Sequence, residues 1–145
     1  MRVATWNVNS LKVRLPQVLQ WLAEREADAT PVDLLCLQEL KLPDDRYPLA
    51  ELDAAGYASL FTGQKTYNGV AILARKAALP EGRDVVKNIP GFADEQQRIV
   101  AATYDVDGGP VRVISAYIPN GQALDSDKFV YKLRWLEALQ AWLTS

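Results

Sequence analysis

The feature that most constrains the fold is an almost uninterrupted apolar run over residues 32–38, centred on Leu34-Leu35-Cys36-Leu37. A strand with this pattern is buried on both faces, as parallel strands covered by helices are. The residues before it predict a strand over residues 2–8 and an amphipathic helix that ends near Asp28. That helix carries apolar residues at i, i+3, i+4 and i+7, namely Leu15, Val18, Leu19 and Leu22. The chain therefore begins with a β-α-β unit, which is expected to cross over in the right-handed sense.

The rest of the chain continues to alternate between strands and helices. Residues Ser10 to Arg14 are predicted as a turn before the first helix, and residues 49–55 as a short helix. Further strands are predicted over residues 57–62, 69–74, 98–106 and 111–117, with a weak edge strand over 84–89. A last helix is predicted from about Asp127 to the end of the chain. This succession is typical of a single domain of the α/β class.

Composition excludes several classes of protein. With 49% hydrophobic and 23% charged residues, the 145-residue chain is an ordinary globular one. Its net charge of −2 argues against a protein that coats nucleic acid by bulk charge, although a local basic cleft remains compatible with it. The one cysteine, Cys36, is predicted to be a buried core residue, which suits a reducing cytosol. Without an apolar run of about 18 residues or a secretory signal, we expect a cytoplasmic protein with no membrane partner.

Polar side chains follow the first two predicted strands at the point where each strand ends. Asn7 closes one strand, and Glu39 comes directly after the other. Because the carboxyl ends of adjacent parallel strands meet at one edge of a sheet, these side chains are predicted to lie side by side, where ligands bind. Oxygen ligands of this kind suit Mg²⁺ or Mn²⁺. Taken singly, a polar residue after a strand is usually a turn former or a helix cap.

Two more segments carry residues that suit phosphate chemistry. Tyr117 ends a strand in the segment YIPNG, and Arg98 begins one in the segment EQQRIV. A tyrosine in a strand is often a packing residue and a strand-initial arginine is often solvated, but a guanidinium also matches phosphate oxygens. The basic residues beyond the strand ends are surface charges that a phosphate backbone could cross: Lys12, Arg14, Lys41 and Lys65, with Lys132 on the last helix.

Five segments together identify a family resemblance. They are WNVNSLK (6–12), LQELK (37–41), YNGVAIL (67–73), EQQRIV (95–100) and YIPNG (117–121), in this order. Over essentially all its length the chain resembles the N-terminal part of the exonuclease III-type apurinic/apyrimidinic endonucleases, in the endonuclease/exonuclease/phosphatase superfamily. The resemblance implies the N-terminal half of a four-layer α/β/β/α sandwich, here as one mixed sheet with flanking helices.

The resemblance also implies roles for individual residues. Asn7 and Glu39 are expected at the divalent metal, Mg²⁺ or Mn²⁺, with Glu39 as the principal carboxylate. Tyr117 is expected to contact the scissile phosphate, and Arg98 to support that side of the site. The residues expected to contact double-stranded DNA around an abasic site or a 3′ end are Lys12, Lys41, Lys65, Tyr67, Asn68 and Asn120.

Other members carry Asp-x-Asn and Ser-Asp-His segments downstream, and these have no counterpart among residues 1–145, which contain no histidine. We therefore expect the N-terminal portion of a monomeric enzyme, nearly inactive alone, whose uncovered sheet face could self-associate. Two alternatives remain at this point. One is a phosphatase or lipid phosphodiesterase of the same superfamily, and the other is a non-catalytic module that binds nucleic acid.

Overall fold

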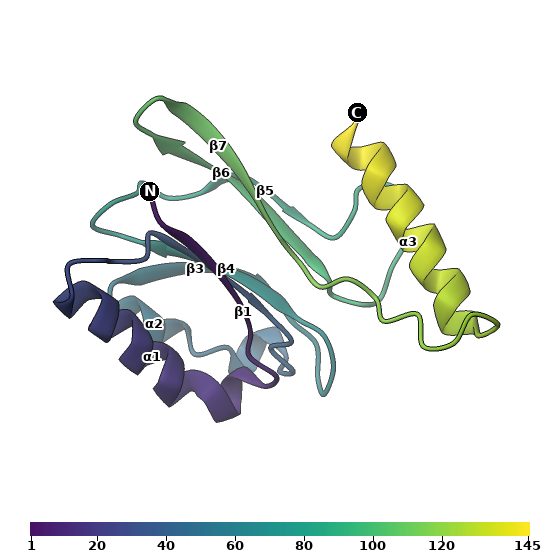
Figure 1. Ribbon diagram of the computed structural model, residues 1–145, viewed down its shortest axis with the longest axis horizontal. Helices are drawn as coiled ribbons and strands as arrows, with labels where there is room; N and C mark the ends of the chain where they lie inside the picture. Colours follow the sequence, from purple (N-terminus) through teal and green to yellow (C-terminus); the bar gives the residue numbers. More distant parts are fainter.

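The computed structural model describes all residues from Met1 to Ser145 and confirms the predicted succession of elements (Figure 1). The elements are β1 (Val3–Asn7), α1 (Leu11–Ala27), β2 (Leu34–Gln38), the 3-10 turn η1 (Asp44–Arg46), α2 (Leu49–Ala54), β3 (Tyr57–Thr62), β4 (Val70–Arg75), β5 (Arg83–Lys87), β6 (Ile99–Val106), β7 (Gly109–Ala116) and α3 (Asp127–Leu143). Neither long helix has the length and apolar character needed to cross a bilayer.

The start of α1 differs from the prediction. Residues 10–14 were expected to form a turn, but the helix already begins at Leu11. Ser10 is its N-cap, and its Oγ accepts a hydrogen bond from the Val13 amide at 3.4 Å, which satisfies one free N–H of the first turn. Leu11 is fully buried and extends the apolar stripe by one turn. The helix therefore approaches the carboxyl end of β1 with almost no intervening loop.

The first sheet is mixed and has the strand order β1-β2-β4-β3. Strands β1 and β2 are parallel, with Asn7 opposite Gln38, as the β-α-β pattern predicts. The other pairs are antiparallel: β4 lies between β2 and β3. Because the first two strands run in the same direction, the residues after Asn7 and Gln38 emerge at one edge of the sheet.

The second half of the chain forms a separate antiparallel sheet with the order β5-β6-β7. It packs on the face of the first sheet opposite α1 and α2, and α3 covers its outer face (Figure 1). The mixed sheet with flanking helices is present as expected, and a second sheet that was not expected accompanies it. The second sheet covers the inner face of β2 and β4, whereas Val3 and Thr5 on the inner face of β1 stay exposed. The face was predicted to be bare because alternation identifies a strand but not the sheet in which that strand pairs. Self-association through the exposed part of that face stays a prediction.

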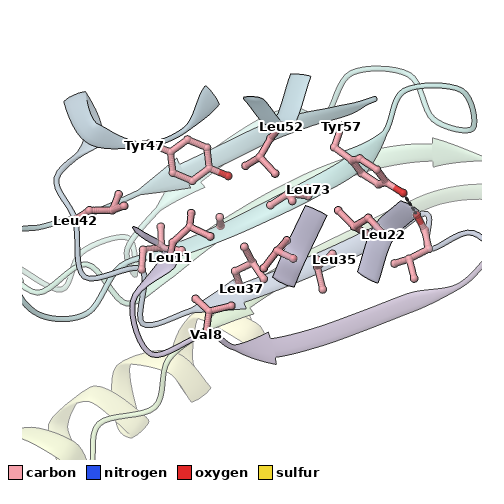
Figure 2. Close-up of a cluster of buried hydrophobic side chains, with 14 residues drawn as sticks. Val8, Leu11, Leu22, Leu35, Leu37, Leu42, Tyr47, Leu52, Tyr57 and Leu73 are labelled. Carbon is pink, nitrogen blue, oxygen red and sulfur yellow. Dashed lines mark hydrogen bonds between the residues drawn. The ribbon is translucent and has the colours of Figure 1, made fainter. Parts of the chain in front are cut away.

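Two alternating sets of side chains build the layers. From β2 and β4, Leu35, Leu37 and Leu73 point toward α1 and α2, whereas Cys36 and Ile72 point toward the second sheet. Figure 2 shows the first set packed between the sheet and the two helices. The second set meets residues Val100, Ala102 and Tyr104 of β6. The continuous apolar run of β2 thus faces a hydrophobic layer on each side, and Cys36 is a buried core residue as predicted.

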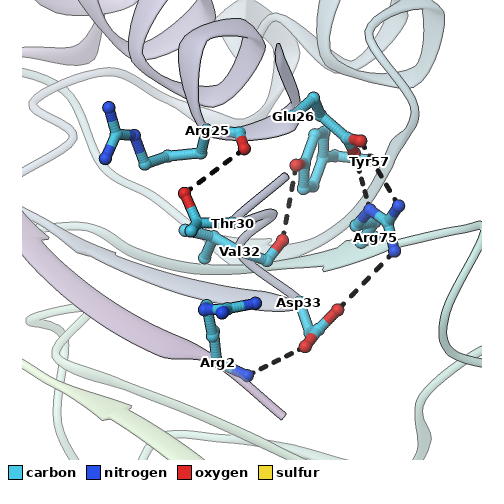
Figure 3. Close-up of polar contacts among 8 residues, drawn as sticks. All are labelled: Arg2, Arg25, Glu26, Thr30, Val32, Asp33, Tyr57 and Arg75. Carbon is cyan, nitrogen blue, oxygen red and sulfur yellow. Dashed lines mark hydrogen bonds and ion pairs between the residues drawn. The ribbon is translucent and has the colours of Figure 1, made fainter. Parts of the chain in front are cut away.

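A cluster of charged residues lies at the end of the first sheet where β1 and β2 begin (Figure 3). The Arg75 guanidinium donates to both carboxylate oxygens of Glu26, at 2.6 and 3.3 Å, and lies 3.7 Å from a carboxylate oxygen of Asp33. The other Asp33 oxygen accepts from the Arg2 amide at 2.8 Å. These contacts tie the C-terminal end of α1 to the amino ends of β1 and β2. They lie at the far end of the strands from Asn7 and are structural.

Candidate active site

Asn7 and Glu39 lie side by side at the carboxyl ends of β1 and β2. The Asn7 side-chain amide donates to Glu39 Oε1 at 2.7 Å, and Asn7 Oδ1 accepts from the Asn9 amide at 3.1 Å. The first bond fixes the carboxylate, and the second fixes which way the amide points. The juxtaposition predicted from the two strand ends is therefore present.

Lys41 faces this pair rather than open solvent. Its ammonium donates to Asn9 Oδ1 and lies 3.4 Å from Glu39 Oε2. Glu39 and Lys41 both have left-handed backbone angles, with φ of 56° and 55°, and Leu40 between them is fully buried. The irregular backbone lets Leu40 enter the core while its two charged neighbours meet above the sheet edge.

Glu39 and Tyr117 shift each other's protonation. Partial burial raises the pKa of Glu39, but the Asn7 hydrogen bond, the Tyr117 phenol and the Lys41 ammonium outweigh it, so this pKa lies below its ordinary value. Burial and the charge of Glu39 raise the pKa of Tyr117, and the Arg98 cation opposes them only partly. At neutral pH the site therefore holds an ionised carboxylate beside a protonated phenol.

Arg98 supports Tyr117 from the second sheet. Its guanidinium donates to the Tyr117 carbonyl oxygen at 3.0 Å, and the Tyr117 amide donates to the Arg98 carbonyl at 2.9 Å. The guanidinium carbon also lies 4.9 Å from the centre of the Tyr117 ring. These contacts attach the segment after β7 to the start of β6.

The two halves of the site are joined by the loop over residues 63–69. Within it, the Asn68 carbonyl accepts from the Lys41 amide at 2.9 Å, and the Gly69 carbonyl accepts from Leu40 at 3.1 Å. On the other side, the Gly69 amide donates to the Gln97 carbonyl at 2.8 Å. Residues 68 and 69 therefore bridge the Glu39 segment and the Arg98 segment.

Beside this bridge lies a polar pocket of about 470 Å³ that holds no acidic side chain. It is lined by three tyrosines, two cations and several amides: Gln64, Tyr67, Asn68, Gln96, Arg98, Tyr117, Pro119, Asn120, Gly121, Gln122, Lys128 and Tyr131. A lining of amide, aromatic and cationic side chains, with no acidic ones, suits a ligand that carries both phosphates and aromatic bases.

Comparison with known proteins supplies the family. The sequence model of the Endonuclease/Exonuclease/phosphatase family matches residues 4–144. The chain belongs to this family. Among curated relatives, exodeoxyribonuclease III of Haemophilus influenzae is 30% identical over 145 residues, covering 99% of this chain and 51% of that protein.

Solved structures of the family agree with the fold. A 3′-5′ exonuclease (NExo) from Neisseria meningitidis has a TM-score of 0.86 and 49% identity, and an AP endonuclease from Archaeoglobus fulgidus has a TM-score of 0.84 and 37% identity. In both cases the match covers 99% of this chain and 51% of the other. The resemblance to exonuclease III-type enzymes is thereby confirmed. The chain spans about half the length of the relatives it matches.

The structure gathers most of the residues that the family motifs predict. Asn7, Glu39 and Lys41 form one cluster, and the pocket collects the others. The pocket members among the predicted residues are Tyr67, Asn68, Arg98, Tyr117 and Asn120. Lys12 and Lys65 are exposed and lie outside both groups.

Several residues of the site were not predicted from the sequence. Asn9 lies within the WNVNS motif, so its position beside Lys41 could have been inferred from the motif. Tyr131 lies one helical turn before the buried Trp135, and a hydroxyl on the inner face of a helix is itself a signal. Gln97 likewise lies within the EQQRIV motif, whereas Gln64 carries no such signal, because its partner Gln97 comes from a loop far away in the chain.

Proposed function

We propose that residues 1–145 are the N-terminal portion of a Mg²⁺-dependent DNA phosphodiesterase of base-excision repair. The enzyme would cut the backbone 5′ to abasic sites and degrade 3′ ends in the 3′→5′ direction. The observation that carries the proposal is the meeting of Glu39, its partner Asn7 and the Tyr117 phenol at one sheet edge. Carboxylate, amide and phenol side by side supply a metal ligand and a hydrogen-bond donor to the phosphate, which are two of the requirements of metal-assisted phosphodiester hydrolysis.

The oxygens at this edge fit a hard divalent cation, Mg²⁺ or Mn²⁺. Glu39 contributes an ionised carboxylate, and Asn7 and Asn9 contribute amide oxygens. No group of three His, Cys, Asp or Glu side chains forms here, and in the cluster of Asn7, Asn9, Glu39 and Lys41 only Glu39 carries a negative charge. Mg²⁺ commonly keeps several waters and binds through one or two carboxylates plus substrate phosphate, which accords with so sparse a set. When bound, the metal would neutralise charge on the phosphate.

The remaining residues have roles that follow from their chemistry. Tyr117, kept protonated by its surroundings, donates a hydrogen bond to a phosphate oxygen as charge develops there. Arg98 holds Tyr117 in place and adds positive charge on that side. The duplex would contact the exposed Lys12 and Lys65 and the loop residue Tyr67, which is 66% exposed. Asn68, Asn120 and Lys41 would complete the path along the backbone.

A second candidate is an enzyme that acts chiefly on 3′ ends. Two Neisseria structures support it: the 3′-5′ exonuclease NExo, and a 3′ phosphatase NExo bound to a product DNA hairpin. They are 49% and 48% identical to this chain, whereas the AP endonuclease structure is 37% identical. We therefore propose that 3′-end processing accompanies incision and could exceed it.

A substrate panel separates these possibilities. The 145-residue chain and the protein encoded by its whole reading frame are each assayed with Mg²⁺ on abasic duplex, duplex with a 3′ phosphate, duplex with a 3′ hydroxyl, and inositol phosphates. We expect DNA turnover by the longer protein and almost none by the shorter. Turnover of inositol phosphates alone would favour a phosphatase, and DNA binding without turnover by either protein would favour a binding module.

The Glu39→Gln substitution tests the site within the active form. It removes the charge but keeps the shape, so DNA turnover should fall about a hundredfold or more and more Mg²⁺ should be required. Glu26→Gln is the matched control, since Glu26 lies in the structural cluster at the opposite edge. Unchanged turnover in Glu39→Gln would remove Glu39 from the site.

A further inference from the structure

Arg98 is a buried cation without an acidic partner. Its residue is 9% exposed, and no ion pair in the structure includes it. Burying a charge is costly unless other groups replace its water. Its guanidinium donates to Gln96 Oε1 at 2.9 Å and to the Tyr117 carbonyl at 3.0 Å, and it lies between two aromatic rings.

The second ring belongs to Tyr131 of α3. The Arg98 guanidinium carbon is 5.6 Å from the centre of the Tyr131 ring and 4.9 Å from that of Tyr117, so both phenols contact the same cation. Cation–π contacts of this kind are strongest where the cation is desolvated, as Arg98 is. The segment after β7, the start of β6 and the last helix therefore meet at one guanidinium.

Asp94 and Phe92 in turn fix the position of Tyr131. Its hydroxyl donates to Asp94 Oδ2 at 2.6 Å, and the Phe92 ring approaches its edge with centroids 6.5 Å apart. Burial and the Asp94 carboxylate raise the pKa of Tyr131, so it remains a donor at every pH at which the protein would work. Asp94 also accepts from the Gln96 amide at 2.9 Å, which connects it to the other group that binds Arg98.

We propose that Tyr131 is a positioning residue of the active site, which acts through Arg98 to fix the Tyr117 phenol beside Glu39. The chain of contacts runs from Asp94 to Tyr131, from Tyr131 to Arg98, and from Arg98 to both the ring and the carbonyl of Tyr117. Helix α3 is thereby part of the support of the site as well as a cover for the second sheet. The inference rests on the proposed function only where it concerns turnover.

Two substitutions distinguish the contribution of the Tyr131 ring from that of its hydroxyl. Tyr131→Leu removes the ring that faces Arg98, and Tyr131→Phe keeps the ring but breaks the bond to Asp94. Leu139→Ala is the matched control, because Leu139 packs α3 on the second sheet without lining the pocket. The first readout is NMR of the ring-labelled tyrosines in the 145-residue chain, with the Tyr117 resonance assigned by its loss in Tyr117→Phe.

We expect Tyr131→Leu to shift the Tyr117 resonance, Tyr131→Phe to shift it less, and Leu139→Ala to leave it unchanged. In the form of the protein that cleaves DNA, Tyr131→Leu should lower kcat about tenfold, the size of one cation–π contact, with little change in KM. An unmoved Tyr117 resonance in Tyr131→Leu, or an equal shift in Leu139→Ala, would overturn the inference. Absence of DNA cleavage by the wild type would instead count against the proposed function, and the NMR result would still decide the role of Tyr131.

Discussion

The bridge between the two halves of the site depends on Gly69, and its replacement by alanine gives a quantitative test. Gly69 has φ of +92°, and a Cβ at this position would meet the Leu40 Cβ at 2.9 Å and its Cγ at 3.3 Å. Leu40 is fully buried and cannot easily retreat. The left-handed backbone costs a non-glycine residue about 1–2 kcal/mol. Overpacking of a filled core adds about 1–3 kcal/mol.

Gly69→Ala is therefore expected to lower the free energy of unfolding by about 2–5 kcal/mol, a large part of the about 5–15 kcal/mol typical of a domain. Gly91→Ala is the matched control, because Gly91 has φ of +80° but no atom within 4 Å of the added Cβ. The control should lose only the backbone contribution, about 1–2 kcal/mol. Both are measured by urea unfolding at one temperature. Equal losses in the two variants would refute the close contact with Leu40.

Three further perturbations test other parts of the molecule. Tyr117→Phe should lower kcat about a hundredfold with little loss of DNA affinity, because it removes a hydrogen-bond donor to the charge that develops on the phosphate in the transition state. An equal loss of kcat and of DNA affinity would favour a packing role for Tyr117. Lys41→Ala should weaken duplex binding and lower the slope of log K against log salt by about 0.9, and an unaltered slope would confine Lys41 to pairing with Glu39. The hydrogen bond from Arg75 lowers the pKa of Glu26, so its contribution to stability is present above the ordinary pKa of 4.5 and is lost as the pH falls through the lower folded value. Arg75→Met should therefore lose less stability than the wild type on acidification by the same urea assay, and identical acid profiles would contradict this role.

How far the fold follows from sequence is shown by β2 and by the second sheet. The apolar run of β2 predicts burial on both faces, and the parallel pairing with β1 follows from the helix between them. The strands over residues 83–116 were also predicted. Alternation along a strand indicates which of its faces is apolar, but it does not indicate to which sheet the strand belongs. For this reason the second sheet, which covers Ile72, was not predicted as a separate layer.

The site shows the same division. Asn7 and Glu39 were predicted together because each ends a strand and the strands are neighbours. Tyr131 was not predicted at the site, since its contact with Arg98 depends on the packing of α3 on the second sheet. Gln64, whose side-chain oxygen accepts from both Asn68 and the Gln97 amide, depends wholly on the meeting of two loops.

The strained backbone of the site lies directly beside the hydrophobic core. Left-handed residues other than glycine gather there: Asn9, Ser10, Glu39, Lys41 and Asn68. Each costs on the order of 1–3 kcal/mol, so together they approach the whole stability of a small domain and must be offset nearby. The buried residues Val8, Leu11 and Leu40 lie next to four of them in the chain, Asn9, Ser10, Glu39 and Lys41, and belong to the core under α1. Burial of each such side chain contributes roughly 1.5–3 kcal/mol, which is the right size to hold a neighbouring strained residue. Asn9, Ser10, Glu39 and Lys41 thus keep their unusual backbone because an apolar residue one position away is fixed in the core.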